Sequence, residues 1–493
     1  MKRTALMILA AQSLLPLARL QAADAATAPK PNVVIMLIDD MGYGDIGPYG
    51  ATKQKTPNLD RMAREGMKLT NFYAAPVCSV SRAQLLTGCY GARISEPAVY
   101  GPGGKQGLNP AEFTIAERLK EHGYATMCIG KWHVGDQPEF LPLRQGFDHY
   151  FGFPYSNDMQ MKAAATGEKV VPLVRDDKVE ELCTDDAQNF IVEKYTNEAV
   201  AFIRKSKDKP FLLYLAHTAV HVPIHPGAAF VGKSSNGRFG DWVEELDWSA
   251  GRVLDTLREL KLDDHTLVIF TSDNGPWLVK GADAGSAGPL RGGKGSTWEG
   301  GMREPTIAWW PGKIAPGSVC SAVAGTIDLL PTAVALAGGT VPATPVIDGR
   351  DISPLLLGKS TQSPREAHYY FRSYSLEAVR QGPWKLAVIP QHETMGKGVL
   401  PDASGTEPRL YNLDEDIGER TNVADKHPEI VTKLKTLADR MNHEIGGDHP
   451  AARRPAGVVD KPTTLFPVAR DTAEKKKEKK AQDNKPKDKT PGN

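Results

Sequence analysis

Apolar runs alternate with amphipathic segments along the first half of the 493-residue chain. The run Asn32–Ile38 is apolar at almost every position, which is typical of a strand buried on both faces in a parallel sheet covered by helices. Further strands are expected at Tyr124–Ile129, Pro210–Ala216 and Thr266–Thr271, and helices at Ala111–His122, Glu198–Lys205 and Leu246–Leu260. This alternation predicts an α/β fold with one large, mixed, mainly parallel sheet flanked by helices.

The pattern changes after about Leu357, where short strand candidates follow one another with turns between them. A small antiparallel sheet with one helix is therefore expected beside the main unit. The strands are predicted at Ala367–Phe371, Glu377–Gln381, Trp384–Ile389 and Arg409–Leu413, and the helix at Pro428–His443. We predict an N-terminal domain over residues 31–360 and a C-terminal subdomain over residues 361–450.

The two ends of the chain have compositions of their own. A basic start, a short apolar run and a small-residue site near Ala22 predict a secretory signal peptide over residues 1–22. That run is too short for a membrane span, so we expect an exported protein, periplasmic or secreted. The Lys-rich segment 471–493 has almost no apolar residues and is predicted to be disordered.

Net charge and cysteine content add little to the prediction of function. Lysine plus arginine total 60 against 59 acidic residues, so no net field indicates a nucleic-acid partner. Five cysteines are an odd number for an exported chain. If Cys78 is set apart, four remain, and the sequence alone does not say whether or how they pair: Cys89, Cys128, Cys183 and Cys320.

Acidic and amide side chains follow two of the predicted strands. Asp39 and Asp40 follow the first, and Asp273 and Asn274 follow Thr266–Thr271. Because parallel strands bring their carboxyl ends to one edge of the sheet, these oxygens are expected to converge. An all-oxygen set with this charge suits Ca²⁺ better than Mg²⁺. Taken singly, each pair also fits a helix cap or a turn.

A cysteine and an arginine begin a short helical run. Cys78 and Arg82 lie at its expected N-terminus, where backbone N–H groups and the helix dipole favour anions. The planar guanidinium of Arg82 suits a tetrahedral oxyanion. On its own, such a cysteine is more often a small buried apolar residue.

Lysines and histidines follow the other predicted strands. Lys131 and His133 lie in a Gly-Lys-Trp-His-Val-Gly segment after Tyr124–Ile129, and His217 and His221 follow Pro210–Ala216. Lysine can neutralise an oxyanion and histidine can transfer a proton near neutral pH. Each segment alone also fits an ordinary loop at a strand end.

Two further segments carry polar candidates. Lys294 lies in a glycine-rich stretch that ends at Arg303, which is expected to brace the loop. Its glycines permit close backbone approach to an anion, but the spacing of a Walker phosphate loop is absent. Ser156 follows a Phe-Gly-Phe-Pro turn and is a secondary candidate.

Together these motifs resemble the type I sulfatases, in the arylsulfatase A-like branch, from about Pro31 to Ala424. The motif around Cys78 is similar to the family segment whose cysteine is oxidised to formylglycine by a formylglycine-generating enzyme. Val80 departs from it, because the family usually has proline or alanine there. The resemblance implies an alkaline-phosphatase-like fold and hydrolysis of sulfuric esters.

The resemblance also implies roles for the candidate residues. Cys78 becomes the nucleophile as formylglycine, beside Arg82. Lys131 and Lys294 bind sulfate, His133 acts as a base, and His221 lies near the leaving oxygen. Ser156 and His217 are secondary substrate-binding candidates. The implied ligands of one Ca²⁺ are Asp39, Asp40, Asp273 and Asn274.

The substrate is predicted only as a class. Export points to a sulfated polysaccharide or oligosaccharide, although an aryl sulfate also fits the family, and specificity is expected in loops at 158–186 and 391–407. Two alternatives stay open. One is a phosphatase or phosphodiesterase of the same superfamily, and the other is a catalytically silent protein that binds sulfated glycans because Cys78 is not matured.

Overall fold

The computed structural model describes residues 30–396, 399–402 and 407–469. The predicted signal peptide and the predicted Lys-rich tail lie outside these ranges. Among the described residues, no helix is both long and apolar enough to cross a bilayer.

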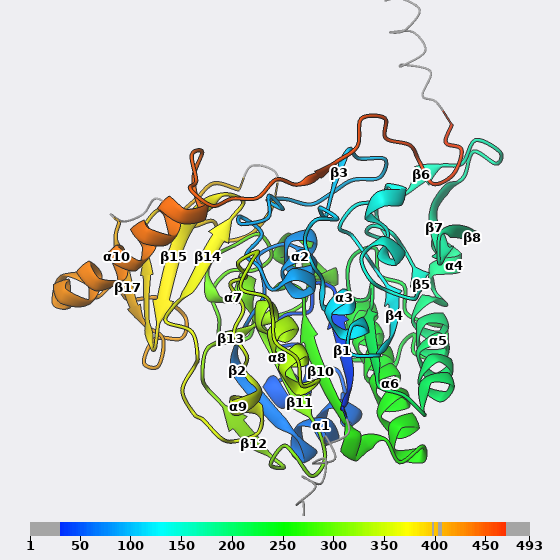
Figure 1. Ribbon diagram of the computed structural model, residues 1–493, viewed down its shortest axis with the longest axis horizontal. Coiled ribbons are helices and arrows are strands. Elements are labelled where there is room, and N and C mark those ends of the chain that lie inside the picture. The colour runs from blue at the N-terminus through cyan, green and yellow to red at the C-terminus, as the bar shows by residue number, and fades with distance from the viewer. Residues whose placement is uncertain (1–29, 397–398, 403–406, 470–493) are drawn as a thin grey trace, which may run out of the picture.

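A twelve-stranded sheet forms the centre of the molecule (Figure 1). Its five middle strands are parallel, in the order β10-β1-β9-β4-β5. They span Thr266–Ser272, Asn32–Ile38, Phe211–Ala216, Ala125–Gly130 and His149–Gly152. Every residue of β1 is buried, as expected for a strand covered on both faces. The predicted α/β fold is confirmed.

Antiparallel partners extend this sheet at both sides and make it mixed. On one side β11 runs antiparallel to β10 and β2 runs antiparallel to β11, and on the other β7 runs antiparallel to β5. The outer strands are β11 (Arg303–Trp309), β2 (Met67–Tyr73), β12 (Ser318–Cys320), β13 (Ala324–Gly325), β7 (Lys169–Arg175), β6 (Met161–Lys162) and β8 (Lys178–Cys183).

Strands β6, β7 and β8 correct the sequence interpretation of residues 158–186 as a specificity loop. Alternate residues of β8 are more exposed, and its glutamates and lysine hide the apolar signal. The segment is the edge of the sheet.

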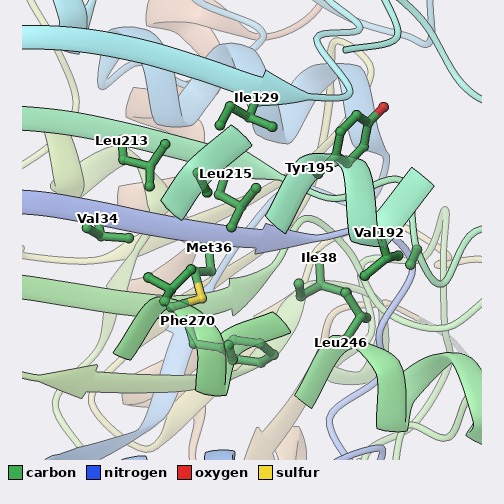
Figure 2. Close-up of a cluster of buried hydrophobic side chains, with 14 of the residues drawn as sticks. Val34, Met36, Ile38, Ile129, Val192, Tyr195, Leu213, Leu215, Leu246 and Phe270 are labelled. Atoms are coloured by element: carbon green, nitrogen blue, oxygen red, sulfur yellow. The ribbon is translucent and has the colours of Figure 1, made fainter. Parts of the chain in front are cut away.

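Helices cover both faces of the sheet. Val34 and Met36 of β1 face the core under α1, α5 and α6, whereas Val33 and Ile35 face α2, α3, α8 and α9. Figure 2 shows the first of these cores, with Val192 and Tyr195 of α5 and Leu246 of α6 against the strands. The helices are α1 (Pro57–Glu65), α2 (Cys78–Thr87), α3 (Ile115–Lys120), α5 (Ile191–Ser206), α6 (Gly237–Glu259), α8 (Leu329–Leu336) and α9 (Ser353–Leu356).

Helix boundaries differ most from the sequence expectation. Helices α5 and α6 begin earlier than Glu198 and Leu246, because weak helix formers precede the predicted starts, Thr196 and Asn197 in α5 and Gly237 and Gly240 in α6. Helix α3 begins later than Ala111. Thr114 caps it by accepting from the backbone N–H of Glu117, whose side chain caps in return.

The C-terminal part forms a four-stranded antiparallel sheet beside the main unit, with α10 packed on it (Figure 1). The elements are β14 (His368–Arg372), β15 (Ser375–Gln381), β16 (Trp384–Ala387), β17 (Arg409–Asn412) and α10 (Pro428–Ile445). After α10 the chain runs back across the main unit, where β18 (Gly457–Val458) pairs with β3 (Gln106–Gly107). The exact domain boundary near residue 360 stays a prediction.

The remaining helical elements are short. They are α4 (Asp185–Gln188) and α7 (Glu299–Met302), and 3-10 turns at Gly47–Tyr49, Pro138–Phe140, Pro142–Arg144, Asp263–His265, Leu278–Asp283, Thr326–Asp328 and Ala424–Lys426. All five cysteines are buried and none forms a disulfide. Cys128 lies in the apolar core.

Candidate active site

The candidate residues gather at the carboxyl edge of the parallel strands. Each of the five central strands supplies at least one of them just after its last residue. The set comprises Asp39 and Asp40 after β1, Asp273 and Asn274 after β10, Lys131 and His133 after β4, His217 and His221 after β9, and Ser156 after β5. Cys78 and Arg82 come from α2, and Lys294 from the loop before α7. All of these residues are buried.

Backbone hydrogen bonds fix the segments that follow the strands. The N–H of Asp39 donates to the carbonyl of Ala219 at 3.0 Å, and the N–H of Val220 donates to the carbonyl of Asp39 at 2.8 Å. Asp40 and His133 have φ angles of 59° and 60°, a left-handed conformation that costs energy for residues with a Cβ. Such strain is commonly kept where a side chain must be aimed at a functional site.

Carboxylate oxygens lie close to one another at this edge. One ligand atom each from Asp39, Asp40 and His221 lies within 4.8 Å of the others, and the same holds for Asp39, Cys78 and Asp273. Asn274 donates from Nδ2 to Oδ1 of Asp40 at 2.8 Å. The acidic side chains from β1 and β10 therefore converge, as expected.

Two buried oxygens in this cluster accept no hydrogen bond from any residue that the structure describes. They are Oδ1 of Asp39 and Oδ1 of Asn274. A buried carbonyl or carboxylate oxygen left without a partner costs free energy, which a hard cation would offset by coordinating it. The donor set is oxygen-rich and anionic, so these residues fit a bound divalent metal ion.

Three cations surround the carboxylates. Arg82 donates from Nε and Nη2 to Oδ2 of Asp273 at 3.0 and 2.7 Å. Lys294 Nζ lies 2.6 Å from Oδ1 of Asp40, and Lys131 Nζ forms an ion pair with Asp39. An arrangement of buried cations around one point suits a small, highly charged anion.

The charges shift the pKa values in opposite directions. Burial alone would raise the pKa of Asp39, but Lys131, His221 and Arg82 together hold it well below its usual range. Burial and the neighbouring Asp39 raise the pKa of Asp273 to about 7. The pKa shifts therefore favour the ionised form of Asp39 and the protonated form of Asp273, as expected for like charges that share a site.

Cys78 lies in the first turn of α2, and its side chain is buried. Burial raises the pKa of its thiol, although Lys131 and Lys294 act against this shift. The unmodified residue is therefore a neutral thiol at neutral pH, which is a poor nucleophile.

His133 is held in one tautomer. Its Nε2 lies 3.0 Å from the carbonyl oxygen of Tyr100, which can only accept, so Nε2 carries the hydrogen. Nδ1 is buried without a partner among the described residues. Burial, with Lys131 and Arg82 nearby, holds the pKa of His133 well below its usual value. The ring is neutral at physiological pH, with Nδ1 ready to accept a proton.

Ser156 and His221 join this group. Ser156 Oγ accepts from Lys131 Nζ at 3.2 Å and lies 3.5 Å from Nδ1 of His221. His221 Nδ1 donates to the carbonyl of Val222 at 2.6 Å, and its Nε2 lies 3.7 Å from Asp40. Ser156, a secondary candidate from the sequence, thus contacts the two main candidates Lys131 and His221.

His217 lies apart from the others. Its Nε2 is 3.2 Å from the hydroxyl of Ser249 on α6, which in turn bonds Thr196 on α5. Burial lowers the pKa of His217 to about 3. These contacts tie β9 to the helices, and a substrate contact of His217 stays a prediction.

Some residues that shape the site are not evident from the sequence. The ring of Trp277 lies 4.6 Å from the ammonium of Lys294. The signal that could have identified Trp277 is its place in an Asp-Asn-Gly-Pro-Trp run that begins with the candidate ligands Asp273 and Asn274. The carbonyls that hold Lys294 and His133 in place belong to the backbone, for which no sequence signal exists. Arg303 contacts Glu299 at 3.5 Å and the carbonyl of Thr70, so it braces the loop as predicted.

Comparison with known proteins gives the family. Residues 31–339 match the family described as sulfatase, and residues 363–456 match the C-terminal region of aryl-sulfatase. Human arylsulfatase A is 39% identical over 457 residues, covering 84% of this chain and 88% of its own length. The N-acetylgalactosamine-6-sulfatase of Canis lupus familiaris is 42% identical over 384 residues, covering 73% and 72%.

A solved structure agrees with these matches. The PsFucS1 sulfatase from Pseudoalteromonas sp. superposes with a TM-score of 0.76 at 30% sequence identity, covering 85% of this chain and 92% of that one. The alkaline-phosphatase-like fold is confirmed, and hydrolysis of sulfuric esters is the activity of the family. The chain belongs to the sulfatase family.

Proposed function

We propose that this protein is a sulfatase whose nucleophile is a formylglycine made from Cys78 and whose metal ion is Ca²⁺. One observation carries this proposal: Cys78, two unpartnered buried oxygens and three buried cations meet at one edge of the sheet. The supporting arguments are the donor chemistry and the family.

The cations are proposed to bind the sulfate group. Lys131 and Lys294 each have N–H groups to offer beyond those used on Asp39 and Asp40, and Ser156 adds a hydroxyl beside Lys131. These fixed groups stabilise the charge that spreads over the sulfate oxygens in the transition state, and such stabilisation commonly contributes most of the rate enhancement. Asp39, Asp40, Asp273 and Asn274 would hold the Ca²⁺, and when bound it would supply further positive charge beside the reacting oxygens.

The proposed reaction breaks the ester in two stages. A hydroxyl of the hydrated aldehyde at position 78 gives its proton to water and attacks sulfur as an alkoxide, whose charge Arg82 and Lys131 stabilise. The sulfur–oxygen bond to the alcohol breaks, and the alcohol departs with a proton from the enzyme. Lys294 is the better donor of that proton, because the neutral tautomer of His221 keeps its hydrogen on Nδ1 for Val222. Nδ1 of His133 then accepts the proton of the second hydroxyl, the carbon–oxygen bond to sulfate breaks, and the aldehyde is restored.

Maturation is proposed to precede folding. Cys78 is buried and lies in a helix, whereas a modifying enzyme needs an extended, accessible segment. Export through a signal peptide agrees with this order, since the chain is unfolded while it is translocated.

The proposed substrates are sulfated polysaccharides or oligosaccharides. This choice rests on the relative named N-acetylgalactosamine-6-sulfatase and on the predicted export. Aryl sulfates are useful probes of the same chemistry.

The test is sulfate release by protein expressed with a formylglycine-generating enzyme. We expect the wild type to release sulfate from 4-nitrophenyl sulfate and from sulfated oligosaccharides, and Cys78→Ala to release none. Cys320→Ala is the matched control, because Cys320 is a free cysteine on the outer strand β12. Binding of the glycans without sulfate release, in protein with the aldehyde at position 78, would favour the silent binding protein instead. Release of phosphate in preference to sulfate would favour a phosphatase.

A further inference from the structure

A cavity of about 330 Å³ lies beside the proposed reaction centre. Val77 and Val80, on either side of Cys78 in the sequence, line it together with Gly295, the residue after Lys294. The segments that carry the proposed nucleophile and the sulfate-binding lysine therefore form part of its wall. The volume is at the lower end of small-molecule sites, enough for about one sugar unit.

The walls of this cavity are mostly apolar. Phe371 from β14 and Met395 also line the cavity, and Met395 belongs to the segment 391–407 in which specificity is expected. Val80 stands where the family usually has proline or alanine, and it is packed so closely that a Cβ on Gly91 would lie 2.5 Å from its Cγ1. The departure from the motif therefore shapes this cavity. Apolar side chains suit the C–H face of a sugar ring.

Among the described residues that line the cavity, one is charged. Arg372, at the end of β14, is half-buried and donates from Nε to the carbonyl of Gly295 at 3.2 Å. Among the described residues it forms no ion pair, and none of the described lining residues is acidic. The buried Glu377 on β15 interacts with Arg372, but burial raises the pKa of Glu377 to about 7, so it offsets the charge of the guanidinium only in part. Because apolar walls strengthen electrostatic interactions, this guanidinium favours an anionic group.

We propose that this cavity binds the sugar unit next to the sulfated one, and that Arg372 pairs with an anionic group on that unit. The group is a carboxylate or a second sulfate, both of which match the planar fork of arginine. The inference rests on the proposed function, since it takes position 78 and Lys294 as the reaction centre. The preferred substrates are then oligosaccharides with an anionic group beside the cleaved ester.

The test uses three sulfated disaccharides that differ only in the neighbouring unit: one with a uronate carboxylate, one with a second sulfate, and one neutral. In the wild type, we expect kcat/KM to be higher for at least one anionic disaccharide than for the neutral one. Arg372→Gln should reduce this preference about tenfold to hundredfold, and Arg372→Lys should restore part of it. The disaccharide that loses most identifies the anion.

Control variants distinguish a role of Arg372 in substrate binding from a role in supporting the loop around Gly295. Arg440→Gln removes an exposed arginine on α10 and should leave the preference unchanged. Val80→Ala should raise KM for all three disaccharides, and rates are normalised to the aldehyde content at position 78. An equal fall for all three in Arg372→Gln would mean that Arg372 only supports Gly295, and would overturn the proposal. The proposal would also be overturned if 4-nitrophenyl sulfate had a higher kcat/KM than every disaccharide and Arg372→Gln did not change the disaccharide preference.

Failure of the proposed function gives a different result. If the wild type, with its aldehyde formed, releases sulfate from no substrate, the reaction proposal fails. Binding of the same disaccharides to Cys78→Ala protein then decides the cavity: a preference for the anionic ones that Arg372→Gln abolishes supports it, and equal binding rules it out.

Discussion

Two clusters of buried charges in this protein differ in how completely their polar atoms are paired. The first is the candidate active site, where Asp39 and Lys131 are both fully buried. The second lies where the C-terminal sheet packs on the loop that carries Lys294, and there Glu299 and Lys385 are equally buried. Burial of charge alone therefore does not distinguish a functional site from a structural one.

The pairing of oxygens does distinguish them. In the second cluster, Oε1 of Glu299 accepts from Tyr370 at 2.7 Å and from Lys385 at 3.1 Å, and Oε2 accepts from Tyr73 at 2.6 Å. Burial would raise the pKa of Glu299, but Lys385 and Arg380 hold it well below its usual range. In the first cluster, Oδ1 of Asp39 accepts no hydrogen bond within the described part of the chain. Oε1 of Glu419 in the second cluster also accepts no hydrogen bond among the described residues, but it forms an ion pair with Lys385 at 2.7 Å, whereas the ion pairs of Asp39 are made by its Oδ2. A buried oxygen with neither kind of partner indicates a site for a ligand.

The largest expected effect is on the free energy of unfolding and comes from removing Lys385 from the second cluster. Lys385→Met leaves Glu299 and Glu419 buried with one cation fewer, because Lys385 lies 3.1 Å from the first and 2.7 Å from the second. We expect the free energy of unfolding to fall by about 3–5 kcal/mol. Denaturant unfolding measures this, while the activity of the protein that remains folded should be nearly unchanged. A loss below ~1 kcal/mol would refute the structural assignment of this cluster.

The matched change in the active site is Lys131→Met. It removes an equally buried lysine, but Asp39 keeps Arg82 at 3.8 Å and the other cations nearby. Sulfate release should fall about 10²–10³-fold, as when one donor to a developing anion is removed. The free energy of unfolding should fall much less than it does in Lys385→Met. Equal destabilisation by the two variants would show that the clusters do not differ.

Metal removal sharpens the comparison further. An ion that binds only the folded state adds about 2.7 kcal/mol at a concentration one hundred times its dissociation constant. We expect a chelator to lower the Tm and to abolish sulfate release, and Ca²⁺ to restore both. Asp39→Asn should make the Tm insensitive to Ca²⁺, whereas Glu299→Gln should leave that response intact. A Tm unaffected by chelator and by added Ca²⁺ would contradict the metal assignment.

The last prediction concerns the pH dependence of stability and Glu96, a buried acid that forms no ion pair among the described residues. Burial raises its pKa from 4.5 to about 8. Because the folded state then binds the proton more tightly than the unfolded state, stability from this group is lost as pH rises from about 4.5 to about 8. Glu96→Gln should flatten the stability curve in that window. Thermal unfolding across this range tests the prediction, and an unchanged slope would count against it.

Much of the fold can be predicted because burial leaves a simple signal. The runs at β1, β9 and β10 are apolar on both faces, and the sequence places each within about a residue. The edge strand β8 has adjacent glutamates at Glu180 and Glu181, so it lacks the alternation of apolar and polar residues that marks a half-buried strand. Helices α5 and α6 are predicted too short although their first turns bury Val192 and Phe239, because weak helix formers such as Thr196 and Gly240 lie before the predicted starts.

The site is predictable in part. Side chains that follow parallel strands must meet at one edge, so Asp39 and Asp273 can be joined although they are far apart in sequence. The second cluster cannot be found in this way. Glu299 meets Lys385 only because the C-terminal sheet packs on the main unit, and no local pattern encodes that contact.

The central claim is that activity depends on an aldehyde at position 78. The most direct test is to prepare protein with different degrees of conversion, quantify thiol and aldehyde in the tryptic peptide Leu69–Arg82 by mass spectrometry, and measure sulfate release for each sample. The account predicts a rate that rises in proportion to the aldehyde fraction and extrapolates to zero without it. A rate that does not depend on this fraction would contradict it.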